Sequence, residues 1–213
     1  MKTALIWGAS GGIGRALLKQ LAGDGWAVVA VAREPNGIEE LTPHVIEADI
    51  SSAYEVELAV TTAAQLVDEV NLWVYAAGDI TSGKVSDLSA AEWQRLLDAN
   101  LTGAFLATHF SLPLLATDSH LFYLGAINER LRLPGLSAYA AAKAGLEAFA
   151  EALGKEERKR RVTVVRPGAV DTRFWDKVPL KLPKNALSAA DVAAAITTAF
   201  SQKQTGLLDI QPA

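Results

Sequence analysis

The 213-residue sequence contains no cysteine, which excludes disulfides and thiolate ligands for a metal. Its three histidines, His44, His109 and His120, lack the spacing of a metal site, so no bound metal is expected. A strong positive charge is also missing: the net charge is −4, which argues against a nucleic-acid partner. No apolar run approaches the roughly 18 residues of a membrane span, and no signal peptide is recognisable. The expectation is therefore a cytoplasmic protein without a nucleic-acid or membrane partner.

Apolar residues follow two alternating patterns along the chain. Short runs rich in Val, Ile, Leu and Trp, typical of strands covered on both faces, alternate with longer segments of helical spacing. This alternation predicts an α/β fold, a Rossmann-like, doubly wound parallel sheet of about seven strands in three layers, with one domain over 1–213. The third helical segment is expected to hold two helices that meet near 99–103. The expected strands are 3–7, 27–32, 44–48, 72–76, 120–124, 162–165 and 206–210, and the expected helical segments are 12–23, 53–68, 89–117, 138–158 and 189–201.

A glycine-rich loop follows the first predicted strand. In "WGASGGIGRALL", Gly8, Gly12 and Gly14 have the spacing G-x-x-x-G-x-G. The chain must leave the strand sharply, let a diphosphate approach its backbone and then start a helix, and glycine permits each step because it has no Cβ. The helix N-terminus offers N–H groups and a positive dipole end to phosphates. With a strand before it and a helix after it, this loop predicts dinucleotide binding rather than a plain tight turn.

The end of the second predicted strand indicates which dinucleotide is bound. A site for NAD(H) usually places Asp or Glu there to accept from the ribose 2′-hydroxyl. Here the strand ends with Ala32 and Arg33, and a guanidinium can pair with a 2′-phosphate, assisted by Ser10 and Arg15. The alternative is a solvated Arg33 beside Glu34. NADP(H) is favoured over NAD(H).

Six segments, in order along nearly the whole chain, resemble the short-chain dehydrogenase/reductase family. "GASGGIG" over 8–14 is similar to its cofactor loop, with Trp7 where Thr is usual, and "YAAG" over 75–78 is similar to its Asn-Ala-Ala-Gly, with Tyr75 replacing Asn. The other four are "ADI" over 48–50, "NLTG" over 100–103, the Tyr-x-x-x-Lys pair of Tyr139 and Lys143, and "RPGAVDT" over 166–172. The residues expected to bind the cofactor are Gly8, Ser10, Gly12, Ile13, Gly14, Arg33, Asp49, Ala76, Ala77, Gly78, Tyr139, Lys143, Pro167, Gly168, Val170 and Thr172.

The resemblance implies an oxidoreductase in which Tyr139, Lys143 and Asn100 are catalytic. An unperturbed tyrosine titrates near pH 10, and an ammonium beside it would stabilise the phenolate and lower its pKa. Residues i and i+4 share a helix face, so Lys143 can reach both Tyr139 and the nicotinamide ribose. Tyr139 would exchange a proton with a small carbonyl or alcohol substrate while hydride passes to or from the nicotinamide. Asn100 would hold water or backbone near Lys143, unless it only caps a helix.

Ala126 stands thirteen residues before Tyr139, where the family usually has a Ser that donates to the carbonyl oxygen. Losing one such donor typically costs on the order of 10²–10³ in rate. Three explanations remain open. Asn128 or Ser137 replaces the donor, the substrate does not need it, or the protein binds cofactor with little or no catalysis. Quinonoid dihydropteridine reductases also lack the Ser and have a short substrate loop, and the Gly-Ala segment here is similar to theirs.

The segment 173–187 is predicted to be a short substrate loop. Its Phe174 and Trp175 would form an apolar wall beside the nicotinamide or only pack the loop onto the core. The family usually pairs the helix at 138–158 and the preceding long helix across a two-fold axis. The resemblance therefore implies a homodimer or homotetramer.

Overall fold

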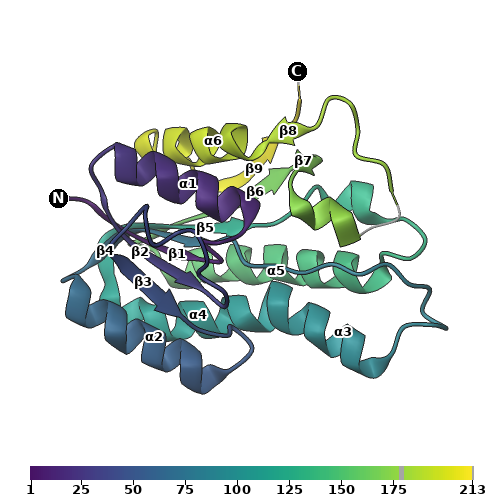
Figure 1. Ribbon diagram of the computed structural model, residues 1–213, viewed down its shortest axis with the longest axis horizontal. Coiled ribbons are helices and arrows are strands. Elements are labelled where there is room, and N and C mark those ends of the chain that lie inside the picture. The colour runs from purple at the N-terminus through teal and green to yellow at the C-terminus, as the bar shows by residue number, and fades with distance from the viewer. Residues whose placement is uncertain (178–179, 213) are drawn as a thin grey trace.

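The central sheet of the computed structural model, which describes residues 1–177 and 180–212, has seven strands, and all neighbouring pairs run parallel (Figure 1). Their order is β3-β2-β1-β4-β5-β6-β9, which confirms the predicted Rossmann-like fold. The chain winds outward from β1 first to one edge and then, through β4, to the other. The strands are β1 (Thr3–Trp7), β2 (Ala27–Ala32), β3 (His44–Glu47), β4 (Val70–Tyr75), β5 (Leu115–Leu124), β6 (Arg161–Pro167) and β9 (Gly206–Ile210).

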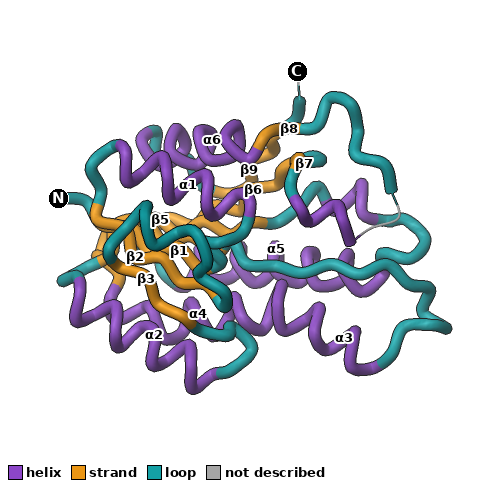
Figure 2. The backbone as a smooth tube through the Cα atoms, in the orientation of Figure 1, coloured by secondary structure: helices purple, strands orange, loops and turns teal. Residues whose placement is uncertain are grey.

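Helices cover both faces of the sheet (Figure 2). In Figure 1, α1 and α6 lie side by side above the sheet, and α2, α4 and α5 lie below it. This is the three-layer arrangement that the sequence predicted. None of the helices in the described ranges is long and apolar enough to cross a membrane. The helices are α1 (Gly12–Gly23), α2 (Ala53–Leu66), α3 (Ala90–Leu97), α4 (Gly103–Ser111), α5 (Ser137–Glu156) and α6 (Ala189–Ser201).

The strands read as continuous apolar runs because each of them feeds two cores. Along β1, Leu5 and Trp7 point into the core under α2, α4 and α5, whereas Ala4 and Ile6 point into the core under α1 and α6. Alternate residues of a strand face opposite sides, so a strand covered on both sides needs apolar residues throughout. Burying each large side chain contributes about 1.5–3 kcal/mol.

The third predicted helical segment holds two helices that meet near 99–103, as expected, and differs from the prediction at its end. A capping box of Ser89 and Glu92 starts it, as the sequence allows. Near the expected break, the chain forms a π-helical turn, η1 (Asp98–Thr102), that joins α3 to α4. The segment stops earlier than predicted, because η2 (Leu112–Leu114) contains Pro113 and β5 already begins at Leu115, which pairs with Val70. The apolar spacing of this stretch suits a helix and a buried strand equally well.

The carboxyl ends of β1 and β4 lie at the point where the strand order reverses. In doubly wound sheets the crevice outside these strand ends is the usual ligand site. Four short elements that the sequence did not predict shape its outer rim. They are η3 (Asn128–Leu131), β7 (Val170–Asp171), η4 (Arg173–Lys177) and β8 (Leu187–Ser188).

Candidate active site

A cleft of about 1570 Å³ runs along the carboxyl ends of the strands and brings the predicted site residues together. Of the predicted residues, Gly14 and Asn100 do not line it: Gly14 is buried in α1, and Asn100 lies beneath the cleft wall. The predicted residues that do line it are Gly8, Ser10, Gly12, Ile13, Arg33, Asp49, Ala76, Ala77, Gly78, Tyr139, Lys143, Pro167, Gly168, Val170 and Thr172.

The glycine loop leaves no room for side chains. Gly8 has a φ of +79°, and a Cβ there would lie 2.5 Å from the backbone nitrogen of Ala77. A Cβ on Gly12 would overlap the Thr172 side chain, and one on Gly14 would overlap the carbonyl oxygen of Gly8. Gly14 therefore serves the packing of the helix on the strand, whereas Gly12 keeps the cleft open.

The start of α1 fits a phosphate group. Its N-cap residue is Gly11, which has no side chain to accept from the first N–H groups, and its first turn holds no acidic residue. Those N–H groups and the positive end of the helix dipole therefore suit an anion in the cleft. Farther along, Asp49 accepts from both the backbone nitrogen and the hydroxyl of Ser51, at 2.9 and 2.8 Å. The backbone hydrogen bond is the main reason that the pKa of Asp49 is lowered.

The end of the cleft beside β2, where the adenosine of a dinucleotide is expected, carries the cations Arg15 and Arg33 and the carboxylates Glu34 and Asp49. Arg33 follows β2 directly, its side chain is 72% exposed, and its Nε lies 3.9 Å from Glu34. The guanidinium of Arg15 lies against Gly37 on the turn after Arg33. Ser10 lines the same end. A pair this exposed is worth little in water, so Arg33 can exchange Glu34 for a phosphate at small cost.

Tyr139 and Lys143 lie on the first turns of α5 and are only 7% and 4% exposed. Lys143 Nζ donates to the carbonyl oxygen of Leu124 at 2.7 Å and lies 5.7 Å from the centre of the Tyr139 ring. Burial disfavours charge on both groups: it raises the pKa of Tyr139 and lowers the pKa of Lys143 to about 7. In the chain by itself, burial therefore outweighs the lowering of the Tyr139 pKa that the sequence predicted.

The low pKa of Lys143 makes protein stability depend on pH. The unfolded chain binds this proton up to about its ordinary pKa of 10.5, whereas the folded chain releases it near pH 7. Between these values the unfolded state holds more protons, so the stability contributed by this group rises with pH, by up to about 1.4 kcal/mol per unit. Urea unfolding at pH 7 and pH 9, without cofactor, should show this rise relative to Lys143→Met. A pH-independent difference between the two proteins would mean that Lys143 keeps its ordinary pKa.

Asn100 is fully buried in the π-helical turn and is not the N-cap residue of α4, which is Thr102. Its Nδ2 donates to the carbonyl oxygens of Asp79, at 2.7 Å, and Leu96, at 2.9 Å. Its Oδ1 has no hydrogen-bond partner among the described residues. A Cβ on Gly78 would lie 2.9 Å from this oxygen and 3.7 Å from Lys143 Nζ, so the glycine keeps the two groups accessible to each other. The turn itself is held by the Tyr75 hydroxyl, which donates to Ala99 O at 2.8 Å.

The two departures from the family pattern, Trp7 and Tyr75, are paired neighbours on β1 and β4. Both are fully buried on the α4 and α5 side of the sheet. Tyr75 stacks on Trp73, and Trp73 contacts Tyr123 on the next strand. The large rings fill this core layer, and Gly103 leaves the space that the Tyr75 hydroxyl occupies.

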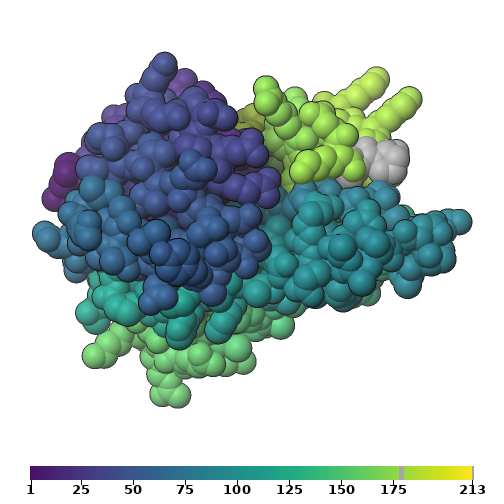
Figure 3. Space-filling model, turned by 60° about the horizontal axis from the view of Figure 1, so that its bottom comes forward, coloured from purple at the N-terminus to yellow at the C-terminus, as the bar shows by residue number. Residues whose placement is uncertain are grey.

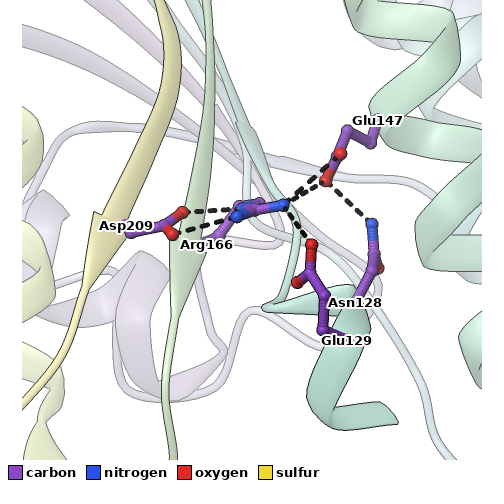
Figure 4. A network of polar contacts seen from close by, with 5 residues as sticks. All are labelled: Asn128, Glu129, Glu147, Arg166 and Asp209. Carbon is purple, nitrogen blue, oxygen red and sulfur yellow. Dashed lines mark hydrogen bonds and ion pairs between the residues drawn. The ribbon is translucent and has the colours of Figure 1, made fainter. Parts of the chain in front are cut away.

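Neither candidate replacement for the missing hydroxyl reaches the cleft. Ala126 lines it, but Asn128 turns away and donates to Glu147 Oε2 at 2.8 Å. Figure 4 shows why: Arg166 lies between Asp209 and Glu147. Arg166 donates two hydrogen bonds to Asp209, of 2.6 and 2.9 Å, and pairs with Glu147 on its other side. Glu147 is thereby held facing Asn128. Ser137 is exposed at the start of α5 and is not among the described residues that line the cleft. The hypothesis that Asn128 or Ser137 substitutes for the Ser is therefore wrong for this arrangement.

Asp79 is a residue of the site that the sequence analysis missed. It pairs with Arg95 of α3 and accepts from Lys177 of η4 at 2.8 Å, while its carbonyl accepts from Asn100. In Figure 3 the yellow-green chain after β7 accordingly lies against the teal chain after β4. A signal was available, because Asp79 is the first charged residue after a predicted strand end, where ligand sites of parallel sheets lie.

A parallel doubly wound sheet with a glycine loop at its switch point defines a Rossmann-type nucleotide-binding fold. The model of the family described as short chain dehydrogenase matches residues 2–182, so the chain belongs to that family and is an oxidoreductase of it. Members of this family generally bind a nicotinamide cofactor.

Individual relatives agree with this assignment. The chain is 28% identical over 211 residues to an uncharacterized oxidoreductase of Staphylococcus epidermidis, covering 94% of this chain and 91% of the relative. The fold is similar to that of a short-chain dehydrogenase/reductase from Serratia marcescens, with a TM-score of 0.90, 22% identity and coverage of 99% and 96% of the two chains. It is also similar to a short-chain dehydrogenase/reductase from Brucella melitensis that is described as a glucose/ribitol dehydrogenase, with a TM-score of 0.89, 25% identity and coverage of 99% and 95%.

Proposed function

We propose that this protein is an NADP(H)-dependent reductase of a small carbonyl compound, with Tyr139 as the proton donor. The observation that carries the proposal is that Tyr139 and Lys143 line the same cleft as the glycine loop, with the buried Asn100 beneath the cleft wall close to Lys143. Ser10, Arg15 and Arg33 at the adenosine end support the choice of NADP(H). The proposal also includes a cytoplasmic location and a single domain over residues 1–213 that holds both the cofactor site and the catalytic residues.

The nicotinamide cofactor supplies the hydride when bound. Tyr139 lines the cleft, and burial keeps its hydroxyl protonated, which is the form needed to donate to a carbonyl oxygen. As the proton leaves, the Lys143 ammonium stabilises the phenolate that forms on Tyr139. Leu124 O holds the end of the Lys143 side chain in place, and Gly78 leaves open the space between Lys143 Nζ and Asn100 Oδ1.

NADPH oxidation with a panel of ketones, aldehydes, quinones and quinonoid pterins tests the proposal. Turnover of at least one class is expected, and quenching of intrinsic tryptophan fluorescence should report NADPH binding in parallel. The competing function is a cofactor-binding protein with little or no catalysis, which Ala126 favours because it removes a donor from the cleft. NADPH binding without turnover of any panel member, by both the native protein and Ala126→Ser, would favour that alternative.

Replacement of Arg33 should change cofactor preference. Arg33→Ser should weaken NADPH binding about tenfold and leave NADH binding unchanged, because a charge-assisted bond to an exposed 2′-phosphate is lost. Titration of tryptophan fluorescence with each cofactor measures both affinities. Arg158→Ser, which removes an exposed cation beyond the far end of α5, is the matched control. Tighter binding of NADH than NADPH by the native protein would refute the role of Arg33.

A homodimer or homotetramer built on α4 and α5 is part of the proposal. Phe105 on α4 is 47% exposed, stacks on His109, and meets Phe149 of α5 edge to face. An exposed aromatic group of this kind on two adjacent helices suits a two-fold contact with a second copy.

A further inference from the structure

We infer that the substrate is a carbonyl compound with an extended apolar body, bound in a slot that leads outward from Tyr139. This inference rests on the proposed function and names its substrate class. The slot begins at a buried cluster of Ile80, Leu136 and Tyr139, against which Leu131 and Phe174 pack. The rings of Tyr139 and Phe174 have their centroids 5.8 Å apart, so the apolar wall reaches the proton donor itself.

The apolar lining continues from this cluster to the surface. Leu133 and Leu180 both line the cleft, yet they are 48% and 47% exposed. Large apolar side chains left in water along one continuous cleft are typical of a ligand surface, because burying them on a ligand is favourable. Further apolar residues that line the cleft, in the part of the chain that the structure describes, include Ile127, Trp175 and Pro183.

Two hydrogen bonds between segments distant in the sequence hold the walls of the slot in place. On one side, Gly83 N donates to Gly135 O at 3.0 Å, and Gly135 has a φ of +84°, which fixes the turn that presents Leu133. On the other side, the Lys177–Asp79 hydrogen bond holds η4, which carries Phe174. The slot is therefore formed before any substrate binds.

Some of the charged residues at this end of the cleft form ion pairs with one another. Asp79 forms ion pairs with both Arg95 and Lys177. Arg130 donates a hydrogen bond of 2.8 Å to the side chain of Gln211. The three carboxylates beside Arg130 are Glu129, Glu147 and Asp209, and each contacts Arg166. Arg173 and Asp171, which also line this end, oppose each other in charge. The lining residues named here carry four positive charges, on Arg95, Arg130, Arg173 and Lys177, against two negative charges, on Asp79 and Asp171. The continuous apolar surface, and not the charge of the lining, therefore carries the inference.

A chain-length series tests the inference. With NADPH and methyl ketones of increasing length, kcat/KM should rise about three- to fourfold per methylene, which corresponds to about 0.8 kcal/mol for each group buried. Leu133→Ser should lower kcat/KM about tenfold for the longest ketones and leave the shortest unchanged. Val85→Ser is the matched control, since Val85 is 76% exposed and is not among the described residues that line the cleft. A flat series, or equal losses for short and long ketones in Leu133→Ser, would overturn the inference.

A binding series separates this inference from the proposed function. If no ketone is turned over, primary alcohols of increasing length, titrated into the protein with NADP+ and followed by tryptophan fluorescence, replace the kinetic measurement. Affinity that rises with length and weakens in Leu133→Ser supports the slot even though the proposed reductase activity has failed. Affinity that is independent of length contradicts the slot, whatever the outcome for catalysis.

Discussion

Tyr139→Phe should lower kcat for carbonyl reduction by about 10²–10⁴-fold and leave NADPH affinity within about twofold. The factor is the usual contribution of a positioned general acid. The ring of Phe keeps the contact with Phe174 and the packing against Ile80 and Leu136, so the fold and the apolar wall remain. Because no described residue hydrogen-bonds to the Tyr139 hydroxyl, its removal leaves no buried partner unsatisfied.

Single-turnover kinetics with saturating NADPH measures this effect without interference from product release. Tyr54→Phe is the matched control, because Tyr54 lies on α2 with 73% of its surface exposed and is not among the described residues of the cleft. The control should keep full activity. An unchanged kcat in Tyr139→Phe would remove Tyr139 from the role of proton donor, and the proposed mechanism with it.

The sequence predicted most of the fold because the two signals used, the apolar runs and the glycine loop, depend on neighbouring residues only. Strand bounds at 3–7, 27–32 and 206–210 and the helix at 12–23 agree with the structure residue for residue, since apolar runs and the glycine loop mark both ends of each. The extension of β5 back to Leu115 was missed because its apolar residues also suit a helix. The pairing of this stretch with β4, which is distant in the sequence, makes it a strand and not a helix.

The sequence predicted the site residues that belong to a motif. It did not predict the side chains whose orientation depends on a contact with a distant residue. The residues that the motifs name line one cleft, except Gly14 and Asn100, which support it from behind. The direction of the Asn128 side chain depends on Glu147, whose position depends in turn on Arg166. Asp79 likewise acquires its importance from Lys177, 98 residues away. No local pattern encodes such long-range partners.

Ala126→Ser should raise kcat/KM for ordinary ketones by as much as about 10²–10³-fold. Ala126 lines the cleft together with Tyr139, and neither Asn128 nor Ser137 supplies a hydroxyl or amide there. A serine would add a second donor to the carbonyl oxygen that Tyr139 protonates, and one such donor has an effect of this size. Steady-state kinetics with a fixed ketone compares the native protein, Ala126→Ser and Ala91→Ser, which adds a hydroxyl elsewhere in the cleft.

The double variant Tyr139→Phe/Ala126→Ser decides whether the two groups act on the same atom. If both donate to one carbonyl oxygen, the gain from serine should shrink strongly when the phenol is absent, because the two effects are coupled. Additive effects would place the serine hydroxyl away from the reacting oxygen. If Ala126→Ser brings no gain on any ketone that the native protein reduces, then the native substrate oxygen already has a second donor. The Ala at this position would in that case reflect the shape of the slot and not a weakened catalyst.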